Sequence, residues 1–522
     1  MATIPLSLTF AILLSTVVAA FHSTAAIDYG ESTISDIQSY FADGSLTSRK
    51  LVSFYLTRIQ SLNPYLRAVI EVNPDALHDA DIADRRRLSG SLLSRGILHG
   101  IPILLKDNIA TRDRLNTTAG SFALLGSVVP RDAGVAGRLR SAGAIILGKA
   151  SLSEWANFRT DHAPNGWCAR NGQGKNPYVA SADPCGSSSG SAISTAAGMA
   201  AAALGTETDG SIICPASANS VVGIKPTVGL TSRAGVIPVS PRQDTVGPMA
   251  RTVADAVAVL EAIVGYDKRD AEATAAATRF VPEGGYRQFL KVEGLKGKRL
   301  GILCRGFSNF SKDSLEGKTL DRHYQVMREK GAILLDNLEI ANASLILDSD
   351  NSGEEVAVLA EFKLAVNAYL SELVTSPVRS LSDLIAFNNE HKIQEKIEEY
   401  GQTILLEAEK TNGLDAKVRA AIKRMAELSA NGIERLMKEN KLDAVVTPDY
   451  SFTPVLAING YPGISVPAGY HQSGVPFGIC FGGLKGSEPT LIEIAYAFEQ
   501  ATKARKPPLL FRREIWDDAL WR

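Results

Sequence analysis

The chain has 522 residues, of which 45% are hydrophobic and 21% are charged, and its formal net charge is −1. This composition provides enough apolar surface for a large buried core and excludes a disordered or collagen-like chain. The near-zero charge gives no electrostatic reason to expect nucleic acid or an anionic membrane surface as a partner. We therefore expect a globular protein without a nucleic-acid partner, and the sequence leaves its oligomeric state open.

Residues 1–26 are predicted to be a cleaved signal peptide. No Asp, Glu, Lys or Arg occurs in residues 1–27, and the apolar stretch 4–20 has the length of a signal core and is followed by small residues. The usual basic segment is missing, so a buried N-terminal helix or an uncleaved anchor is the alternative. No later apolar run reaches about 18 residues, so no stable membrane association is expected after cleavage. The prediction is a secreted or extracellular protein with one domain over 27–522.

Apolar periodicity predicts the following elements along the chain. Residues 33–64 have helical spacing that is broken at Asp43-Gly44, which indicates two helices ending before Pro64. Short apolar runs predict strands at "GIPILLK", which ends at Lys106, and at "GAIILGKAS". From Arg299 onward, predicted strands alternate with amphipathic helices; the strands are "RLGILC", "AILLD", "SLILD" and "LDAVVTP", and the clearest helix covers about 416–439. This alternation is typical of an α/β architecture around a buried sheet.

The cysteines do not indicate a disulfide framework or a metal site. There are five, and they are scattered along the chain: Cys168, Cys185, Cys214, Cys304 and Cys480. No pair has the spacing of zinc ligands, and an odd number leaves at least one free thiol. Any pairing is left open.

Two short motifs suggest chemistry that their context does not support. "GAIILGKA" (143–150) nearly matches a phosphate-binding P-loop, but Ala150 stands where Ser or Thr must bind magnesium, and the apolar strand follows the first glycine. "GSSSG" (186–190) matches the G-x-S-x-G nucleophile elbow with Ser188 as the nucleophile. An elbow needs a strand directly before it, and Asp183-Pro184-Cys185 is a poor end to a buried strand. A Ser-His-Asp hydrolase or esterase is therefore the second mechanism, with three possible histidine partners: His323, His391 and His471.

Lys106 is the stronger candidate for chemistry. A lysine at the end of an apolar strand usually extends to solvent, and it is almost never fully buried without a partner. Two Ser/Gly clusters downstream, "PCGSSSGSA" and "GTETDGSIICPA", offer hydroxyl groups. A lysine desolvated by apolar neighbours loses its proton more readily and can act as a base. Asp107, next in the chain, is expected on the opposite face of the strand, where it need not reprotonate the lysine.

These segments together resemble the amidase signature family of serine hydrolases. The resemblance continues through "VVGIKPTVGLTSRAGVIPVS", "QDTVGPMARTVADAVAVL" and "GYPGISVPAGY" to "EPTLIEIAYAFEQATKARKPP", so it covers nearly the whole chain from about residue 33. Each motif alone is weak, but their order and spacing are specific. The resemblance implies an α/β amidase signature fold, with a large mixed β-sheet core flanked by α-helices.

The resemblance also implies a catalytic triad of Lys106, Ser187 and Ser211. In the family, the serine matching Ser187 follows a cis peptide bond, here Gly186–Ser187, and relays a proton to the lysine. The serine matching Ser211 forms an ester with the acyl group. The substrate-binding residues implied are Ser187 and an oxyanion hole made by backbone N–H groups from Thr208, Asp209 and Gly210 to Ser211. No metal and no cofactor are implied.

Two positions depart from the common family pattern. Where many members read Gly-Gly-Ser-Ile-Arg, this chain has Asp209 in place of the first glycine and Ile213 in place of the arginine. The sequence motifs around both serines resemble those of the peptide-amidase branch. They match the tRNA-dependent amidotransferase subunits of the family less well. The expected substrates are small neutral carboxamides and C-terminal peptide amides, with ammonia released. A secreted binding protein on an inactive scaffold is the non-enzymatic alternative, although all three triad residues are present.

Overall fold

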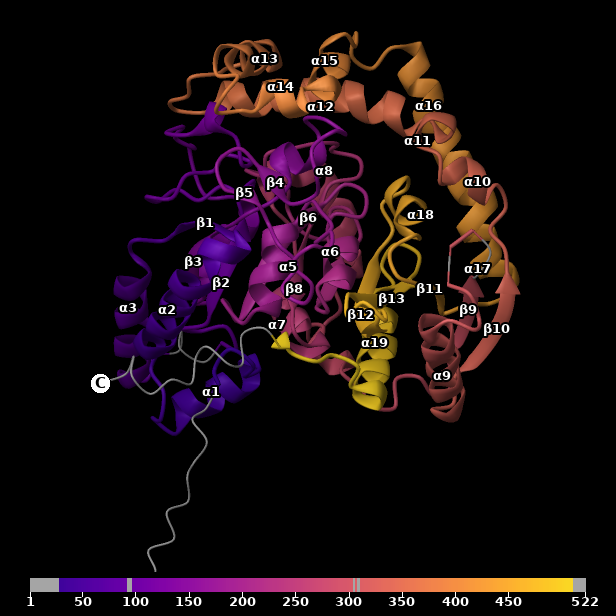
Figure 1. The fold of residues 1–522 in the computed structure, drawn as a ribbon. Coiled ribbons are helices and arrows are strands. Elements are labelled where there is room, and N and C mark those ends of the chain that lie inside the picture. The colour runs from indigo at the N-terminus through magenta and orange to yellow at the C-terminus, as the bar shows by residue number, and fades with distance from the viewer. Residues whose placement is uncertain (1–27, 92–95, 304–305, 308–309, 510–522) are drawn as a thin grey trace, which may run out of the picture.

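A mixed sheet of eleven strands runs through the centre of the computed structural model (Figure 1). The structure describes residues 28–91, 96–303, 306–307 and 310–509, so the predicted signal peptide and Cys304 lie outside the described residues. The strand order is β1-β3-β2-β6-β8-β7-β12-β13-β11-β9-β10, and β4 and β5 form a separate pair. The strands are β1 (Val69–Val72), β2 (Pro102–Lys106), β3 (Ile145–Ala150), β4 (Trp167–Cys168), β5 (Gly172–Gln173), β6 (Ala202–Glu207), β7 (Val222–Lys225), β8 (Thr245–Ala250), β9 (Arg299–Leu303), β10 (Ile333–Leu338), β11 (Ala444–Pro448), β12 (Gly463–Tyr470) and β13 (Pro476–Gly482).

The sheet combines parallel and antiparallel pairs. Strand β2 pairs in parallel with β3 on one side and with β6 on the other. Strand β8 is antiparallel to both β6 and β7, whereas β11 is parallel to β9 and antiparallel to β13. Helices cover both faces, so the strands β2, β3, β6 and β11 are buried along their whole length. The predicted mixed sheet flanked by helices is confirmed.

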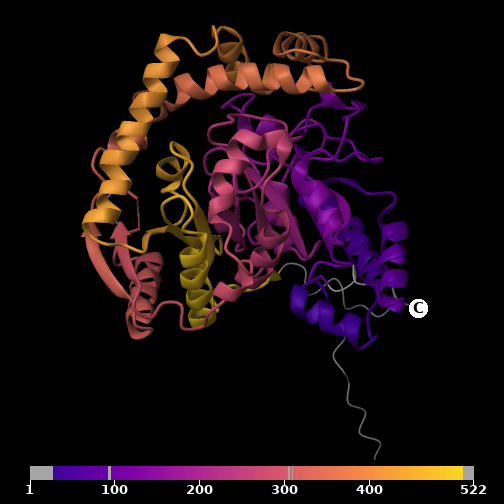
Figure 2. The same ribbon diagram turned by 180° about the vertical axis from the view of Figure 1, so that it is seen from behind.

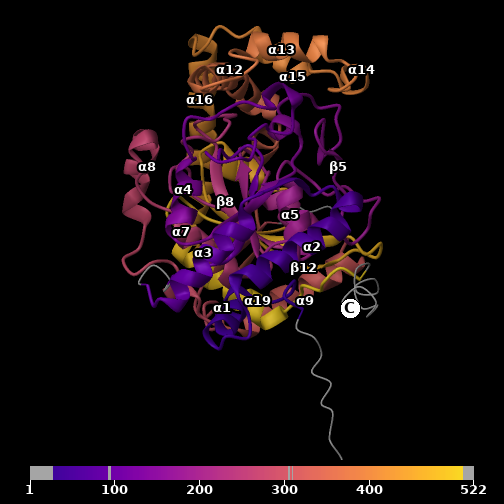
Figure 3. The same ribbon diagram turned by 90° about the vertical axis from the view of Figure 1, so that its left-hand side faces the viewer.

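Helices pack on both faces of the sheet. Helices α4 and α7 lie on one side of β8 and α5 lies on the other, as Figure 3 shows. Helices α12 to α16 lie above the sheet in Figure 1 and keep that place when the molecule is turned (Figure 2). The α-helices are α1 (Ile34–Ala42), α2 (Ser48–Leu66), α3 (Ala76–Leu88), α4 (Gly134–Ser141), α5 (Ser189–Ala196), α6 (Ile213–Ala218), α7 (Val253–Ile263), α8 (Ala271–Ala277), α9 (Leu315–Glu329), α10 (Ala343–Ile346), α11 (Ser349–Ser352), α12 (Glu354–Glu372), α13 (Leu381–Glu390), α14 (Ile397–Tyr400), α15 (Thr403–Glu409), α16 (Ala416–Ser429), α17 (Arg435–Glu439), α18 (Thr453–Ala457) and α19 (Glu488–Thr502). Among the described residues, no helix has both the length and the apolar character needed to cross a bilayer.

Most of the predicted elements are present, with two corrections. The helix expected at 416–439 is confirmed as α16, a π-helical turn over Ala430–Glu434, and α17. Helix α2 runs past Pro64 to Leu66, because a proline in the last turn removes one hydrogen bond without stopping the chain there. The strand predicted at "SLILD" is wrong, because Ala343–Ile346 form α10. Ile346 is buried there within an apolar cluster, and a short apolar run does not distinguish a strand from a buried helix.

Candidate active site

Strand β2 carries Lys106 into the core. The strand ends at Lys106 as predicted, and because it lies between β3 and β6 the lysine side chain is completely buried. Lys106 Nζ lies 2.7 Å from Ser187 Oγ, 3.1 Å from the carbonyl oxygen of Thr206 and 2.8 Å from Thr206 Oγ1. The lysine therefore does not extend to solvent. Its amine reaches one of the two predicted serine segments directly.

Burial lowers the pKa of Lys106 to about 7, and the nearby carboxylates of Glu207 and Asp244 only partly oppose this shift. The three neighbours of Nζ suit a neutral amine, which has two N–H bonds and one lone pair. The N–H bonds can donate to the two oxygens of Thr206, and the lone pair can then accept the hydroxyl proton of Ser187. Near neutral pH, the site therefore contains a base in contact with a serine.

We expect kcat/KM to fall about tenfold per pH unit below pH 7 and to level off above it. A protonated Lys106 has no lone pair, so only the fraction of enzyme with a neutral lysine can remove the Ser187 proton. A pH–rate profile between pH 5.5 and 9, measured on an uncharged amide, checks this expectation. A rate that stays constant between pH 6 and 8 would contradict a lysine base.

Asp107 follows the lysine but faces a different environment. Its carboxylate accepts hydrogen bonds from the hydroxyl of Thr118 and from the backbone N–H of Gly120. Arg170 lies 3.9 Å from the same carboxylate. Asp107 is not among the groups that shift the pKa of Lys106, in agreement with the expectation that it points away from the lysine.

The first serine segment leads into α5, and its residues 186–192 are buried. The peptide bond Gly186–Ser187 is cis, as the family resemblance predicts. A Cβ on Gly186 would collide with Ser153 Oγ, so the tight path of this backbone requires glycine. The backbone N–H of Ser188 donates to the carbonyl oxygen of Ser211 at 3.1 Å. The segments that carry the two predicted triad serines are thus in direct contact.

The second serine lies in the wall of a cavity. Thr208, Asp209 and Ser211 line a cavity of about 520 Å³, and Ser211 keeps 7% of its surface exposed. Gly210 has a φ of +76°, a conformation that favours glycine and turns the backbone between Asp209 and Ser211. The predicted oxyanion-hole segment and the predicted nucleophile therefore face the same space.

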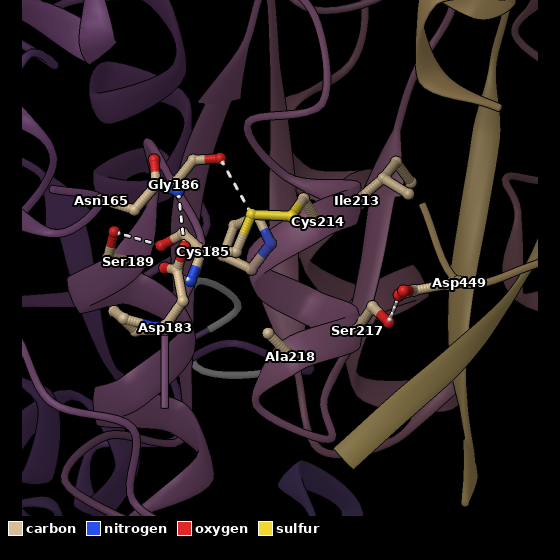
Figure 4. The surroundings of a disulfide bond; sticks show 12 residues. Asn165, Asp183, Cys185, Gly186, Ser189, Ile213, Cys214, Ser217, Ala218 and Asp449 are labelled. Atoms are coloured by element: carbon tan, nitrogen blue, oxygen red, sulfur yellow. Dashed lines mark hydrogen bonds between the residues drawn. A yellow bond between two sulfur atoms is a disulfide. The ribbon is translucent and has the colours of Figure 1, made fainter. Parts of the chain in front are cut away.

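A disulfide between Cys185 and Cys214 links the two serine segments (Figure 4). Cys185 comes two residues before Ser187, and Cys214 comes three residues after Ser211. Their Cα atoms are 5.8 Å apart across 29 residues of sequence. The sequence did not reveal this pair, because five scattered cysteines carry no framework pattern and only the fold brings these two together.

We expect reduction of this disulfide to lower kcat at least tenfold and to lower Tm. Without the link, the Ser187 segment can move relative to Ser211, and the free energy of unfolding falls by about 2–4 kcal/mol. The measurement compares Cys185→Ala/Cys214→Ala with Cys168→Ala, which removes a buried free thiol. Full turnover by the folded double variant would show that the link has no catalytic importance.

The geometry does not favour the competing motifs. The hydroxyl of Ser188 donates to the carbonyl oxygen of Thr206 and accepts its backbone N–H, at 3.0 and 3.2 Å, so it serves the backbone of β6. The three histidines contact other groups. His323 bonds to the carbonyl oxygen of Ala468, His391 stacks on Phe387, and His471 bonds to Glu316.

Lys149 of the P-loop-like motif is buried against Ile109 and Thr117. Among the described residues, no three His, Cys, Asp or Glu side chains are arranged to hold a metal ion.

The structure also identifies supporting residues that sequence reasoning missed. Thr206 holds Lys106 with both of its oxygens, and Asn108 donates to the same hydroxyl at 3.0 Å. The buried Glu207 carboxylate accepts the backbone N–H groups of Ile212 and Ile213, at 2.6 and 2.9 Å, and so holds the turn around Ser211. Apart from Asn108, these supporting residues lie within or beside the "GTETDGSI" run. Their roles depend on the pairing of β2 with β6.

Comparison with known proteins identifies the family of the chain. The model of the family described as Amidase matches residues 50–492. A probable amidase of Arabidopsis thaliana is 61% identical over 478 residues, which cover 92% of this chain and 91% of the plant protein. A putative amidase of Schizosaccharomyces pombe is 38% identical, over 94% of this chain and 88% of the yeast protein. The crystal structure of native peptide amidase from Stenotrophomonas maltophilia superposes with a TM-score of 0.86 at 44% identity, covering 92% of this chain and 99% of the bacterial one. The chain therefore belongs to the amidase signature family and is a hydrolase of carbon–nitrogen bonds.

Proposed function

We propose that this enzyme hydrolyses small carboxamides, C-terminal peptide amides among them, to a carboxylate and ammonia through an ester on Ser211. The observation that carries the proposal is the contact of 2.7 Å between Lys106 Nζ and Ser187 Oγ, made by a buried lysine whose pKa is lowered to about 7. A buried base in contact with a serine is the arrangement needed to activate a hydroxyl nucleophile. The Ser188 hydroxyl, by contrast, bonds to the backbone of Thr206.

The acylation step would proceed as a proton relay. Lys106 takes the proton of Ser187 while Ser187 takes the proton of Ser211, and the Ser211 oxygen attacks the amide carbonyl carbon. Backbone N–H groups between Thr208 and Ser211 would stabilise the oxyanion that forms; losing one such donor typically costs about 2.7–4 kcal/mol of barrier. As the C–N bond breaks, the proton returns along the relay to the leaving nitrogen, which departs as ammonia.

Deacylation would use the same groups with water. A water molecule gives a proton to the relay and its oxygen attacks the ester carbonyl. The bond between that carbonyl carbon and the Ser211 oxygen then breaks, and the proton returns to Ser211. The product leaves as a carboxylic acid, which gives its proton to water or to the released ammonia and becomes the carboxylate, and the neutral Lys106 is restored. All of these steps are proton transfers and acyl transfers, so the relay needs no other reagent than water.

Three observations support small carboxamides as the substrate class. The cavity beside Ser211, at about 520 Å³, lies in the size range of small-ligand sites. Ile213 places no cation beside the reacting centre to clamp a carboxylate. The Stenotrophomonas protein at 44% identity is a peptide amidase, and the motifs around Ser187 and Ser211 resemble that branch.

A substrate panel tests the proposal. We expect kcat/KM for a dipeptide amide to exceed that for a long-chain fatty amide and for indole acetamide, with ammonia released and internal peptide bonds left intact. A tenfold preference for the fatty amide, about 1.4 kcal/mol of transition-state binding, would overturn the peptide-amide assignment while leaving an amidase.

We also propose that the enzyme works in the secretory pathway or outside the cell, after removal of residues 1–26. Two features support this: the uncharged apolar N-terminus and the Cys185–Cys214 disulfide, since disulfides persist mainly in oxidising compartments. N-terminal sequencing of protein from a eukaryotic host tests it. A chain that starts at Met1 or Ala2 in the cytosol would contradict it.

A further inference from the structure

The cavity that contains Ser211 has a strongly acidic wall. Five of its lining residues carry carboxyl groups, and none of its lining residues is Lys, Arg or His. The acidic residues come from separate parts of the chain and converge on this space: Asp161, Asp209, Glu354, Glu355 and Glu407. A cavity lined in this way attracts cations and repels anions.

The two innermost carboxyl groups are Asp209 and Glu354. Glu354 is 7% exposed at the start of α12, and its Oε1 accepts a hydrogen bond of 2.5 Å from Gln243 Nε2. Thr453 donates to the carboxyl group of Asp209, but the buried Oδ1 atom of Asp209 has no hydrogen-bond partner in the part of the chain that the structure describes. A buried carboxyl oxygen without a donor is unfavourable, so this atom favours a ligand that brings a donor.

The two groups also repel each other. Burial and the neighbouring Glu354 raise the pKa of Asp209 well above its usual range, and burial raises the pKa of Glu354 as well. Arg242 is the nearby cation that opposes the shift of Glu354, but this arginine is itself paired with Glu361. A positively charged group placed between Asp209 and Glu354 would remove their repulsion.

The outer carboxyl groups are less selective. Glu407 is paired with Lys410 at 2.6 Å, and Asp161 lies 3.6 Å from His162; these four residues and Glu355 are all exposed. Exposed pairs of this kind contribute little, because water and salt screen them. Recognition of charge therefore rests on Asp209 and Glu354.

We propose that Asp209 and Glu354 form an ammonium-binding subsite beside Ser211, so that the enzyme prefers carboxamides whose acyl part carries a positively charged amino group. This inference rests on the proposed function, and it replaces the neutral carboxamides expected from the sequence with carboxamides that carry a positive charge. Asp209 is two residues from Ser211, so their Cα atoms are at most ~7 Å apart. The ammonium group must therefore lie within about one or two residues of the reacting carbonyl, as in amino-acid amides and short peptide amides with a free N-terminus.

A charge series tests the subsite. The series consists of glycyl-phenylalaninamide, its N-acetyl form and its N-succinyl form, which differ only at the N-terminus. At pH 7.0 the free amino group is positively charged, since an α-amino group has a pKa of about 7.7–8.0. The acetyl group is uncharged, and the succinyl group is negatively charged. We expect kcat/KM of the cationic form to exceed that of the acetyl form at least tenfold, with the succinyl form slowest. Glu354→Gln should reduce the ratio of cationic to acetyl substrate at least fivefold. The control Glu398→Gln, an exposed acidic residue of α14 outside the cavity, should leave this ratio unchanged.

Binding to Ser211→Ala separates the subsite from catalysis. Calorimetry should give at least tenfold tighter binding of glycyl-phenylalaninamide than of its acetyl form, and Asp209→Asn in the same background should remove the difference. Equal affinities would overturn the subsite even if the parent enzyme hydrolyses both amides. Preferential binding of the cation together with no hydrolysis by the parent enzyme would instead overturn the proposed function.

Discussion

Replacing Lys106 with methionine is expected to lower kcat at least 10³-fold. Methionine fills a similar volume but offers no base, so Ser187 loses the group that takes its proton. The measurement is kcat for amide hydrolysis at pH 8, where the parent lysine is neutral.

The same substitution is expected to raise Tm. The pKa of Lys106 is about 7 in the folded protein and about 10.5 when the chain is unfolded, so the unfolded state binds more protons between these values. The lysine therefore destabilises the fold, fully below pH 7 and less as the pH rises toward 10.5. The increase in Tm of Lys106→Met should accordingly be larger at pH 6.5 than at pH 9.5.

Lys149→Met is the matched control. Lys149 is also fully buried, it lies on the neighbouring strand β3, and burial lowers its pKa to about 8. Its amine contacts Ile109 and Thr117 and no triad serine. We expect the folded control to keep kcat within tenfold of the parent. Equal losses in the Lys106 and Lys149 variants would show that a buried lysine is needed for structure and not for chemistry.

Replacing Ser187 with alanine is expected to lower kcat at least 10³-fold and to change KM little. The hydroxyl of Ser187 is the proposed relay between Lys106 and Ser211, and without it the proton has no direct path to the base. The measurement is steady-state kinetics on a dipeptide amide. A KM effect without a kcat effect would assign Ser187 to substrate binding alone.

Ser188→Ala separates the relay from the nucleophile-elbow alternative. The Ser188 hydroxyl makes two hydrogen bonds to the backbone of Thr206, so its loss should lower the free energy of unfolding by about 1–3 kcal/mol. We expect kcat to stay within tenfold of the parent. Loss of turnover in a folded Ser188→Ala protein, with Ser187→Ala still active, would favour Ser188 as the nucleophile.

The sequence predicts most of what lies on central strands. A run of apolar residues ending in a charge is easily recognised, so β2 and the position of Lys106 could be predicted. The amphipathic helix near 416–439 was also clear, because its apolar positions repeat with helical spacing. The family resemblance added Ser187 and Ser211, which residue patterns alone did not distinguish from Ser188.

Other features depend on contacts between distant segments and have no local signal. The Cys185–Cys214 link and the support of Lys106 by Thr206 exist only because β2, β6 and the two serine segments meet in the fold. The "SLILD" segment was wrongly predicted as a strand, because its short apolar run fits α10 equally well. The acidic cavity likewise has no local signal in the sequence. Its carboxyl groups come from distant segments, and Asp161 and Glu407 are 246 residues apart.

The most direct test of the account identifies the nucleophile. The enzyme is treated with a serine-reactive fluorophosphonate, digested, and the modified residue is located by mass spectrometry. We predict modification of Ser211, with labelling abolished in Ser211→Ala and slowed at least 10²-fold in Lys106→Met. Modification of Ser188, or labelling of Ser211 at the parent rate in Lys106→Met, would contradict the proposed relay from Lys106 through Ser187 to Ser211.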